Sequence, residues 1–135
     1  MIRPRRALLG GLAVAAICVG VTLLALEGGE VVVVRTRGPD GAQHTTRTWI
    51  ADHDGYAWLE AANPERPFYA DICAHPDVVL RRGGVDRLCI ATPIATTKGH
   101  GLIRHLLHER YGLADCWIGL LADTSRSLAI RLECR

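Results

Sequence analysis

Residues 31–62, VVVVRTRGPDGAQHTTRTWIADHDGYAWLEAA, decide the fold of this chain. Pro39-Asp40-Gly41 has the composition of a tight turn, because proline presets φ, aspartate bonds to its own backbone and glycine accepts a positive φ. Asp54-Gly55 is the signal of a two-residue hairpin turn. The stretch therefore predicts three antiparallel strands with a defined register.

This register assigns each side chain to a face. Val31 is expected to pair with Trp49, and Ala51 with Trp58, while successive side chains alternate between faces. The inner face should then carry an apolar and threonine set: Val32, Val34, Thr36, Thr46, Thr48, Ile50, Ala57, Leu59 and Ala61. The outer face should carry the polar and aromatic set: Arg35, Arg37, Gln43, Thr45, Arg47, Trp49, Trp58 and Glu60.

The outer face admits two interpretations. Its three arginines lie along the sheet, with hydroxyl and amide donors between them, and two tryptophans follow at the end of this row. This suits a ligand with a phosphate or carboxylate at one end and a flat ring at the other. In the alternative, Arg47 pairs diagonally with Glu60 and the tryptophans pack beneath a helix. The strand pattern by itself leaves both open.

The N-terminal part of the chain predicts a membrane segment. Residues 7–26, ALLGGLAVAAICVGVTLLAL, contain no charged side chain. Twenty helical residues span about 30 Å, the thickness of the hydrocarbon core of a bilayer. Because the acidic run EGGE follows at 27–30 without a clean cleavage site, we expect an uncleaved transmembrane anchor or signal-anchor.

The charges beside this segment predict its orientation. Residues 1–6 form a basic N-terminal segment with Arg3, Arg5 and Arg6, and acids follow the span. The protein should therefore be a single-pass membrane protein with a cytoplasmic N-terminus and the domain outside. Arg5-Arg6 also resembles a twin-arginine export signal, the kind used for domains that fold around a cofactor before crossing. Charges that only set topology are the simpler explanation.

The rest of the chain, residues 27–135, forms one modest domain. It has thirteen basic and fourteen acidic residues, a net charge of −1, so it lacks a nucleic-acid footprint. Four cysteines, Cys73, Cys89, Cys116 and Cys134, could be bridged outside the cell, but no pair has C-x-x-C spacing. Cys89 lies in an apolar strand, where cysteine is often a small hydrophobe, so a structural disulfide is the less favoured interpretation.

The order of the later elements indicates the fold class. We expect a short helix at 68–74, a hairpin of 78–82 and 85–92 around Gly83-Gly84, a helix from Thr96 or Thr97 to Tyr111, and a final strand around 128–132. Residues 113–121 are ambiguous between a short helix and other structure. This order predicts a mainly β, α+β domain, a small six-stranded antiparallel barrel with two or three short helices.

Histidines near the second helix raise the question of a metal site. His105 and Glu109 are one helical turn apart, and His105 and His108 share a face roughly. Their spacing is not that of H-E-x-x-H zinc sites, and histidines on the polar side of a surface helix are the simpler explanation. We therefore predict no metal site.

Several segments together resemble a known family. They are His44-Thr45-Thr46-Arg47-Thr48-Trp49, the hairpin into Tyr56-Ala57-Trp58, the helix at 68–74 with His75-Pro76-Asp77-Val78 after it, and Arg110-Tyr111-Gly112 before the closing strand. This order is similar to that of the split β-barrel flavin and deazaflavin oxidoreductases, a family that includes deazaflavin-dependent nitroreductases and quinone reductases. The similarity covers residues 31–134 and is greatest to an uncharacterised branch with one N-terminal membrane helix.

The resemblance implies a cofactor, either FMN or the deazaflavin coenzyme F420, and hydride transfer to a quinone-like or nitroaromatic acceptor. The cofactor's phosphate side would lie near the first hairpin, and its ring near residues 61–69. With the outer-face residues, the predicted cofactor-binding set is Arg35, Arg37, His44, Thr45, Thr46, Arg47, Trp49, Asn63, Arg66 and Tyr69. Tyr111 is the predicted proton donor to the acceptor, and Trp117 the predicted substrate contact.

Two departures from the family pattern keep a second hypothesis open. The first turn, Gly38-Pro39-Asp40-Gly41, places an acid where family members that use the deazaflavin have a basic, hydroxyl-containing turn. Only Tyr111 and Trp117 remain where the nitroreductases have several tyrosines. The protein is thus either a membrane-anchored reductase of a lipid-soluble acceptor or a non-catalytic anchored binding module. A third possibility, a ligand-free envelope protein, requires Arg35, Arg37 and Arg47 all to be used in internal salt bridges.

The family also bears on assembly and topology. Barrels of this family commonly pair, so a homodimer is expected. Reduced flavin and deazaflavin pools are cytoplasmic, whereas the charge bias places the domain outside. The side of the membrane on which the domain lies therefore stays open at this point.

Overall fold

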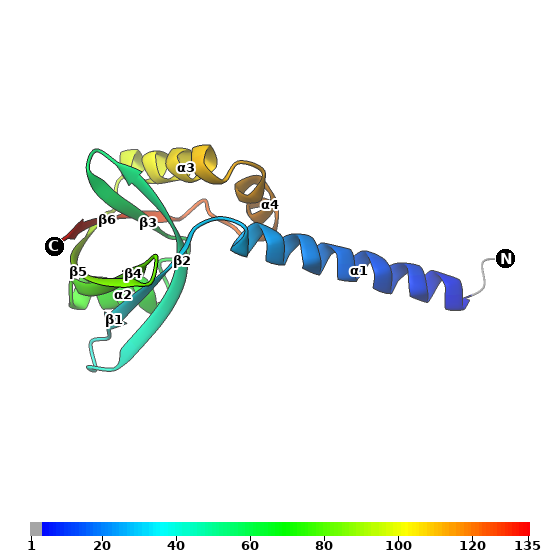
Figure 1. Cartoon of the computed structure of the whole chain (residues 1–135), viewed down its shortest axis with the longest axis horizontal. Coiled ribbons are helices and arrows are strands. Elements are labelled where there is room, and N and C mark those ends of the chain that lie inside the picture. The colour runs from blue at the N-terminus through cyan, green and yellow to red at the C-terminus, as the bar shows by residue number, and fades with distance from the viewer. Residues whose placement is uncertain (1–3) are drawn as a thin grey trace.

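The computed structural model describes residues 4–135 as a barrel with a long N-terminal helix projecting from it (Figure 1). Six antiparallel strands close in the order β1-β2-β3-β6-β5-β4. The strands are β1 (Val31–Arg37), β2 (Gln43–His53), β3 (Tyr56–Ala61), β4 (Asp77–Arg82), β5 (Val85–Ile94) and β6 (Leu128–Cys134). The helices are α1 (Pro4–Glu27), α2 (Pro67–Ala74), α3 (Thr97–Tyr111) and α4 (Leu113–Leu121). The predicted fold class is confirmed; of the basic N-terminal segment, Arg3 lies outside the described residues.

The predicted register of the first three strands is confirmed. Val31 pairs with Trp49 in β1 and β2, and Ala51 pairs with Trp58 in β2 and β3. The turn chemistry explains this agreement, because Gly41 has φ 83° and Asp54 has φ 51°. Asparagine, aspartate and glycine are the residues that tolerate this left-handed region, so the two loops can adopt only a few lengths.

The barrel interior is the main hydrophobic core. It contains the inner-face residues Val32, Val34, Ile50, Leu59 and Ala61 together with Ile130 and Leu132 of the closing strand. Helix α2 packs onto this core through Phe68 and Ile72. Proline at the first position of α2 favours a helix start there, because its missing N–H is not needed.

A second apolar cluster lies outside the barrel, beneath α3. Ile103, Leu106 and Leu107, on one face of α3, pack with Trp58 and Trp49. Helix α3 begins where the sequence predicted, since the Thr96 hydroxyl caps it by accepting a hydrogen bond from the Gly99 amide at 3.0 Å. The tryptophans therefore pack beneath a helix, as the alternative interpretation of the outer face expected.

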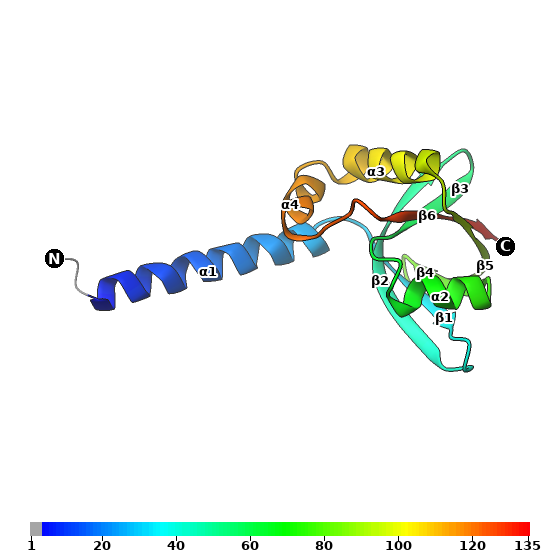
Figure 2. The same cartoon turned by 180° about the vertical axis from the view of Figure 1, so that it is seen from behind.

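The C-terminal end of α1 contacts the barrel domain, and the rest of the helix projects away from it, as Figure 2 shows from the other side. It is long and apolar enough to cross a membrane. Its last turn contacts the domain: Ala25 is buried, and the Leu26 carbonyl accepts a hydrogen bond from the Trp49 indole at 3.1 Å. The ambiguous segment that follows Gly112 is helical and forms α4 beside this end of α1.

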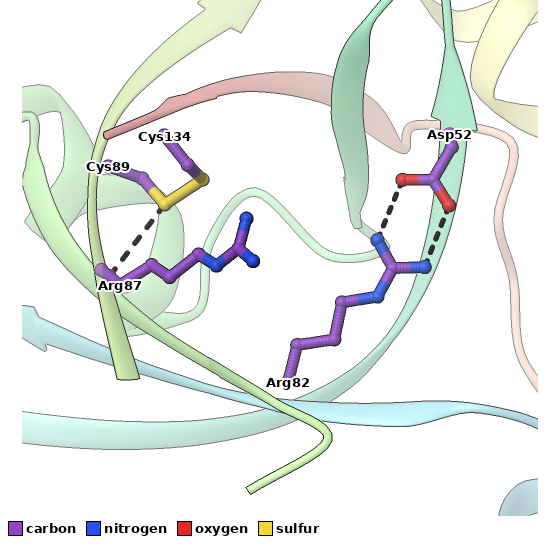
Figure 3. The surroundings of a disulfide bond; sticks show 5 residues. All are labelled: Asp52, Arg82, Arg87, Cys89 and Cys134. Atoms are coloured by element: carbon purple, nitrogen blue, oxygen red, sulfur yellow. Dashed lines mark hydrogen bonds and ion pairs between the residues drawn. A yellow bond between two sulfur atoms is a disulfide. The ribbon is translucent and has the colours of Figure 1, made fainter. Parts of the chain in front are cut away.

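The cysteine prediction was wrong for one pair. Cys89 of β5 and Cys134 of β6 stand directly opposite each other and form a disulfide (Figure 3). The strand pattern correctly places Cys89 in the apolar interior, but the closing strand brings a second sulfur against it. Cys73 and Cys116 are exposed free thiols.

Candidate functional site

A cavity of about 450 Å³ lies between the barrel, α3, α4 and the C-terminal end of α1. Arg47 and Trp49 of β2 line one side, and Ile118 and Gly119 of α4 line another. Leu26 of α1 contributes to the rim. The volume falls in the range of small-molecule sites, and the cavity lies where the C-terminal end of α1 meets the domain.

Trp49 is held rigidly at this cavity. Its ring stacks on Tyr111 with centroids 4.4 Å apart and planes 9° apart, and its indole N–H donates to Leu26. Beside it, the Arg47 guanidinium donates to Glu27 at 2.5 Å. Both members of this ion pair are more than half exposed, so the pair is weak and an anionic ligand could replace Glu27.

The cavity also has a fixed charge cluster that the sequence did not indicate. Arg104 of α3 donates to both oxygens of Glu60 and to both oxygens of Asp115, the latter at 2.6 and 2.8 Å. Burial alone would lower the pKa of Arg104, but these two acids outweigh it and raise that pKa. Glu60 thus pairs with Arg104 and not with Arg47, which corrects the diagonal pair considered from the strand register.

Arg66 supplies a second available cation. It lines the same cavity, is exposed, and has no ion-pair partner within residues 4–135. The resemblance implied that Arg47 lies on the phosphate side of a cofactor and that residues 61–69 lie near its ring. The barrel brings Arg47 and Arg66 to one cavity.

The other predicted arginines lie elsewhere. Arg35 and Arg37 line a separate recess of about 100 Å³ on the outer face of β1. Arg35 donates to Asp86 at 2.6 Å, whereas exposed Arg37 has no ion-pair partner in the described part of the chain. Thr45 faces Arg35 across the ladder and is exposed. The predicted row of arginines is therefore divided between two places, and it is not entirely used up in salt bridges.

His44 and Thr46 belong to the inner side of β2. The His44 Nδ1 lies 2.7 Å from the Asp71 carboxylate, which also accepts a hydrogen bond from the Thr36 hydroxyl at 2.7 Å. Asp71 is 1% exposed, and from the sequence pattern only its place in the short helix could be predicted, not its contacts with His44 and Thr36. These contacts join α2 to the barrel at a distance from the cavity.

Asn63 and Tyr69 have structural contacts and do not line the 450 Å³ cavity. The Asn63 side chain accepts a hydrogen bond from the Glu65 amide at 2.9 Å and so stabilises the turn before α2. Tyr69 packs against the barrel core, and burial raises its pKa. Their position after β3 follows the prediction, but their side chains serve the turn and the core.

Tyr111 and Trp117, the predicted catalytic and substrate residues, are held by other parts of the chain. The Tyr111 hydroxyl, which has one proton to donate, lies 2.7 and 2.9 Å from the Glu30 and Ile50 carbonyl oxygens and accepts a hydrogen bond from the Ile50 amide. Burial raises the pKa of Tyr111. The Trp117 indole donates to the Thr22 hydroxyl of α1 at 3.0 Å. Tyr111 reaches the cavity only through the Trp49 ring stacked on it.

Comparison with known proteins shows the architecture. No family model and no curated protein matches the sequence. Among solved structures, an F420-H2 dependent reductase matches with TM-score 0.58 and 17% identity over 77% of this chain and 94% of that one. A conserved hypothetical protein from Mycobacterium tuberculosis matches with TM-score 0.58 and 18% identity over 87% and 79%. A candidate pyridoxamine 5′-phosphate oxidase from Listeria innocua matches with TM-score 0.55 and 16% identity over 84% and 90%.

This chain has the split β-barrel fold of these solved structures. The residues that line the 450 Å³ cavity bear on the flavin or deazaflavin cofactor that the sequence resemblance implied. A phosphate needs available cations, which Arg47 and Arg66 provide, and an aromatic ring needs a flat apolar wall, which Trp49 provides. The residues present therefore fit a phosphorylated, ring-bearing ligand. The acid of the first turn, Asp40, does not line this cavity, and its side chain accepts a hydrogen bond from the Ala42 amide within the turn.

Proposed function

We propose that this split barrel is a membrane-anchored oxidoreductase that binds a flavin or deazaflavin and reduces a lipid-soluble, quinone-like or nitroaromatic acceptor. The observation that carries the proposal is the cavity where Arg47, Arg66 and the Trp49 ring meet beside the end of α1. The bound cofactor would supply the hydride. The protein would supply position and charge.

Each side chain in this proposal has a defined task. Arg47 and Arg66 bind the phosphate group, with Glu27 giving up its pairing with Arg47. Trp49, fixed by Tyr111 and Leu26, forms one wall for the ring. Ile118 and Gly119 of α4, with Ala122 directly after the helix, line another wall, which would limit the access of water to the bound ring.

The contacts of α1 support an anchor that remains on the protein. Its last turn supplies the acceptor for the Trp49 indole and the carboxylate for Arg47. Loss of α1 would leave Trp49 without this partner and would remove one rim of the cavity. A permanent anchor also keeps the domain next to substrates that dissolve in the bilayer.

The domain is proposed to lie outside the cytoplasm. The arginines before α1 favour this orientation, and the Cys89–Cys134 disulfide is typical of oxidising compartments. A cofactor from a cytoplasmic pool would then be loaded before export, which is what the resemblance of Arg5-Arg6 to a twin-arginine signal implies.

A homodimer remains part of the proposal. The outer face of β5 exposes Leu88 and Ile90, at 69% and 39%, next to Val79 of β4. Exposed neighbouring apolar side chains of this kind are often protein contacts. Light scattering on the purified protein, compared with a Leu88→Glu variant, measures whether this face joins two copies.

A non-catalytic binding module is the second candidate function. It is favoured by the Tyr111 hydroxyl, which is occupied by backbone groups and has no proton free for an acceptor. Such a module would bind the same cofactor through Arg47 and Arg66 but would show no turnover with quinone or nitroaromatic acceptors.

The test uses the full chain in lipid nanodiscs, titrated separately with FMN and with F420 while cofactor fluorescence is followed. Loss of a charge-assisted hydrogen bond to phosphate is worth about 1.5–3 kcal/mol, so Arg47→Ala should weaken binding about tenfold or more. Arg66→Ala should act in the same direction. Arg81→Ala is the matched control, because Arg81 is similarly exposed, pairs with Asp86 and lies outside the cavity.

The outcomes separate the candidates. Binding that is weakened by Arg47→Ala but not by Arg81→Ala supports the oxidoreductase if the bound cofactor, first reduced chemically, is then oxidised by two electrons for each acceptor molecule reduced. The same binding without reduction supports the binding module. Absence of binding of both cofactors to the unaltered protein would overturn both.

A further inference from the structure

Helix α4 presents its apolar side outward. Five side chains lie on one face of the helix by their spacing, and all are exposed except Trp117, which is half-buried: Leu113, Cys116, Trp117, Leu120 and Leu121. Leu113, Leu120 and Leu121 are 88%, 81% and 60% exposed. The opposite face contains Asp115, which is buried and bound to Arg104. An amphipathic helix in a water-surrounded domain would have the reverse arrangement.

The position of α4 indicates what covers this face. The Trp117 indole donates to the Thr22 hydroxyl inside the apolar part of α1, and both views place α4 against the C-terminal end of α1 (Figures 1 and 2). Thr22 precedes Leu26, the last residue of the apolar run, by four positions, or about 6 Å along a helix. The Trp117 contact is therefore at the depth of a membrane interface if α1 spans the bilayer. Tryptophan is enriched at this depth.

We propose that α4 is an interfacial membrane helix whose outward leucines enter the outer boundary of the same bilayer that α1 spans. The occupant of the exposed face is thus lipid, and the inference rests on the membrane anchoring proposed above. Helices of this kind bury their apolar face about 5–10 Å into the boundary of headgroups and acyl chains. No charged side chain interrupts the outward stripe from Leu113 to Leu121.

This placement fixes how the cavity meets the membrane. Ile118 and Gly119, on the inner side of the same helix, line the cavity, and Leu26 of α1 lies at its rim. With α4 in the interface, the cavity opens at the level of the lipid headgroups. An amphiphilic molecule with a polar ring and a long apolar tail could then place its ring beside Trp49 while its tail stays among the acyl chains. The recognised substrate class is therefore an amphiphile that enters from the side of the membrane.

The test measures the depth of single labels in the full chain. Cys18, Cys73 and Cys116 are replaced by serine, the Cys89–Cys134 disulfide is kept, and single cysteines carrying a polarity-sensitive fluorophore are placed by Leu120→Cys, Leu113→Cys, Val14→Cys and Asp40→Cys. All four positions are exposed, so labelling does not disturb the core. Each protein is studied in nanodiscs with and without lipids that carry a nitroxide on the acyl chain.

The expected result is at least twofold quenching by the nitroxide lipid at positions 120 and 113 of α4 and at position 14 of α1. The label at position 40, on the hairpin far from α1, should be unaffected. Quenching at position 14 alone would overturn the interfacial helix and leave the anchor standing. Quenching at none of the positions would overturn the anchor, and with it the membrane part of the proposed function.

A third outcome concerns a different occupant. Blue-shifted emission at positions 120 and 113 without lipid quenching would show that protein, such as a second copy, covers α4. That result also overturns the inference. Cofactor binding, measured as described above, does not depend on any of these results.

Discussion

At the scale of single residues, Tyr111 acts through position. Its hydroxyl connects the end of α3 to the Glu30 carbonyl and to both backbone groups of Ile50 in β2. Its ring supports Trp49 at the cavity. Because backbone groups surround the hydroxyl, we expect Tyr111 to stabilise the fold and to orient Trp49. Removing only the hydroxyl separates this structural role from proton donation.

We therefore predict that Tyr111→Phe lowers the free energy of unfolding by about 1–3 kcal/mol, because buried backbone groups lose their partner. Cofactor affinity should change less than twofold, since the ring still stacks on Trp49. Denaturant unfolding and the fluorescence titration measure the two quantities. Tyr56→Phe serves as the control. If turnover vanished while stability stayed the same, Tyr111 would be the proton donor after all.

Four charges outside the cavity connect α3, β2 and β4. Arg82 donates to Glu30 and, with two bonds, to Asp52, as Figure 3 shows for Asp52, and Arg110 also contacts both acids. The hydrogen bond from Arg82 is the main cause that lowers the pKa of Glu30 and of Asp52. The network holds the residue before β1 against the barrel.

This network predicts a loss of stability in acid. A pKa that folding lowers gives stability that is fully present above the unfolded values, near 4.5 for Glu30 and 3.8 for Asp52, and that is lost as pH falls through the lower folded values. Arg82→Gln should therefore lower the free energy of unfolding at neutral pH. As pH falls toward about 3, the variant should then lose less of this free energy than the unaltered protein does. Urea midpoints across this range test it. The control is Arg126→Gln, which breaks the exposed pair with Glu65. Equal pH profiles for Arg82→Gln and the unaltered protein would contradict the prediction.

At the scale of elements, the close contact of α3 with the end of β5 depends on a glycine. A Cβ on Gly99 would lie 2.5 Å from the Ile94 carbonyl oxygen and 2.8 Å from the Ile94 Cγ2. For Gly101, two residues further along α3, a Cβ would have no atom within 4 Å. A side chain is therefore excluded at Gly99 and tolerated at Gly101.

We predict that Gly99→Ala destabilises the protein by about 1–3 kcal/mol, because β5 and α3 must separate to admit the methyl group. Gly101→Ala should instead stabilise it by up to about 1 kcal/mol through helix propensity. Thermal and denaturant unfolding of both variants provide the comparison. If both changes had the same sign, the close packing of α3 on Ile94 would not hold.

At the scale of the whole molecule, the disulfide and the arginines before α1 support the proposed placement of the domain outside the cytoplasm. Cys89 and Cys134 join β5 to β6 across 45 residues of sequence, and such bonds persist in oxidising environments. The arginines before α1 give the same orientation. Both features place the barrel and its cavity on the outer side of the membrane in the proposed topology.

We predict that Cys73 reacts with a membrane-impermeant maleimide in intact cells when Cys18 and Cys116 are replaced by serine. Cys73 is an exposed free thiol on the barrel side, so labelling reports the location of the domain. A Cys73→Ser variant gives the background. Labelling that requires lysis of the cells would place the domain in the cytoplasm, where the reduced cofactor pools are.

Local sequence patterns predicted most of the fold. The turns at Asp40-Gly41 and Asp54-Gly55 set the register, and alternation of side chains then assigned Val34 and Ile50 to the core. The cap at Thr96 predicted the start of α3. These features depend on neighbours within a few residues, which is why they can be read without the tertiary structure.

The candidate site could be predicted only in part. Arg47, Trp49 and Arg66 do line one cavity, but Arg35 and Arg37 lie in another recess, and His44 binds Asp71. The sequence predicts which face of a strand each side chain occupies. It does not predict which part of that face lines a cavity, because the helices that cover the face determine the cavity.

By itself, the sequence determined the strand register, the apolar interior and the apolar N-terminal helix, since turn geometry and side-chain alternation are local properties. Only the tertiary structure decided which distant groups meet. Arg104 binds Glu60, 44 residues away in sequence, and Cys89 pairs with Cys134. The exposed leucines of α4 lie on a helix whose Trp117 contacts Thr22 of α1. Barrel closure and the packing of α1 on the domain bring these distant groups together. Many other partners are compatible with the same local pattern, so their choice depends on which arrangement buries the apolar surface and pairs the charges of the whole chain.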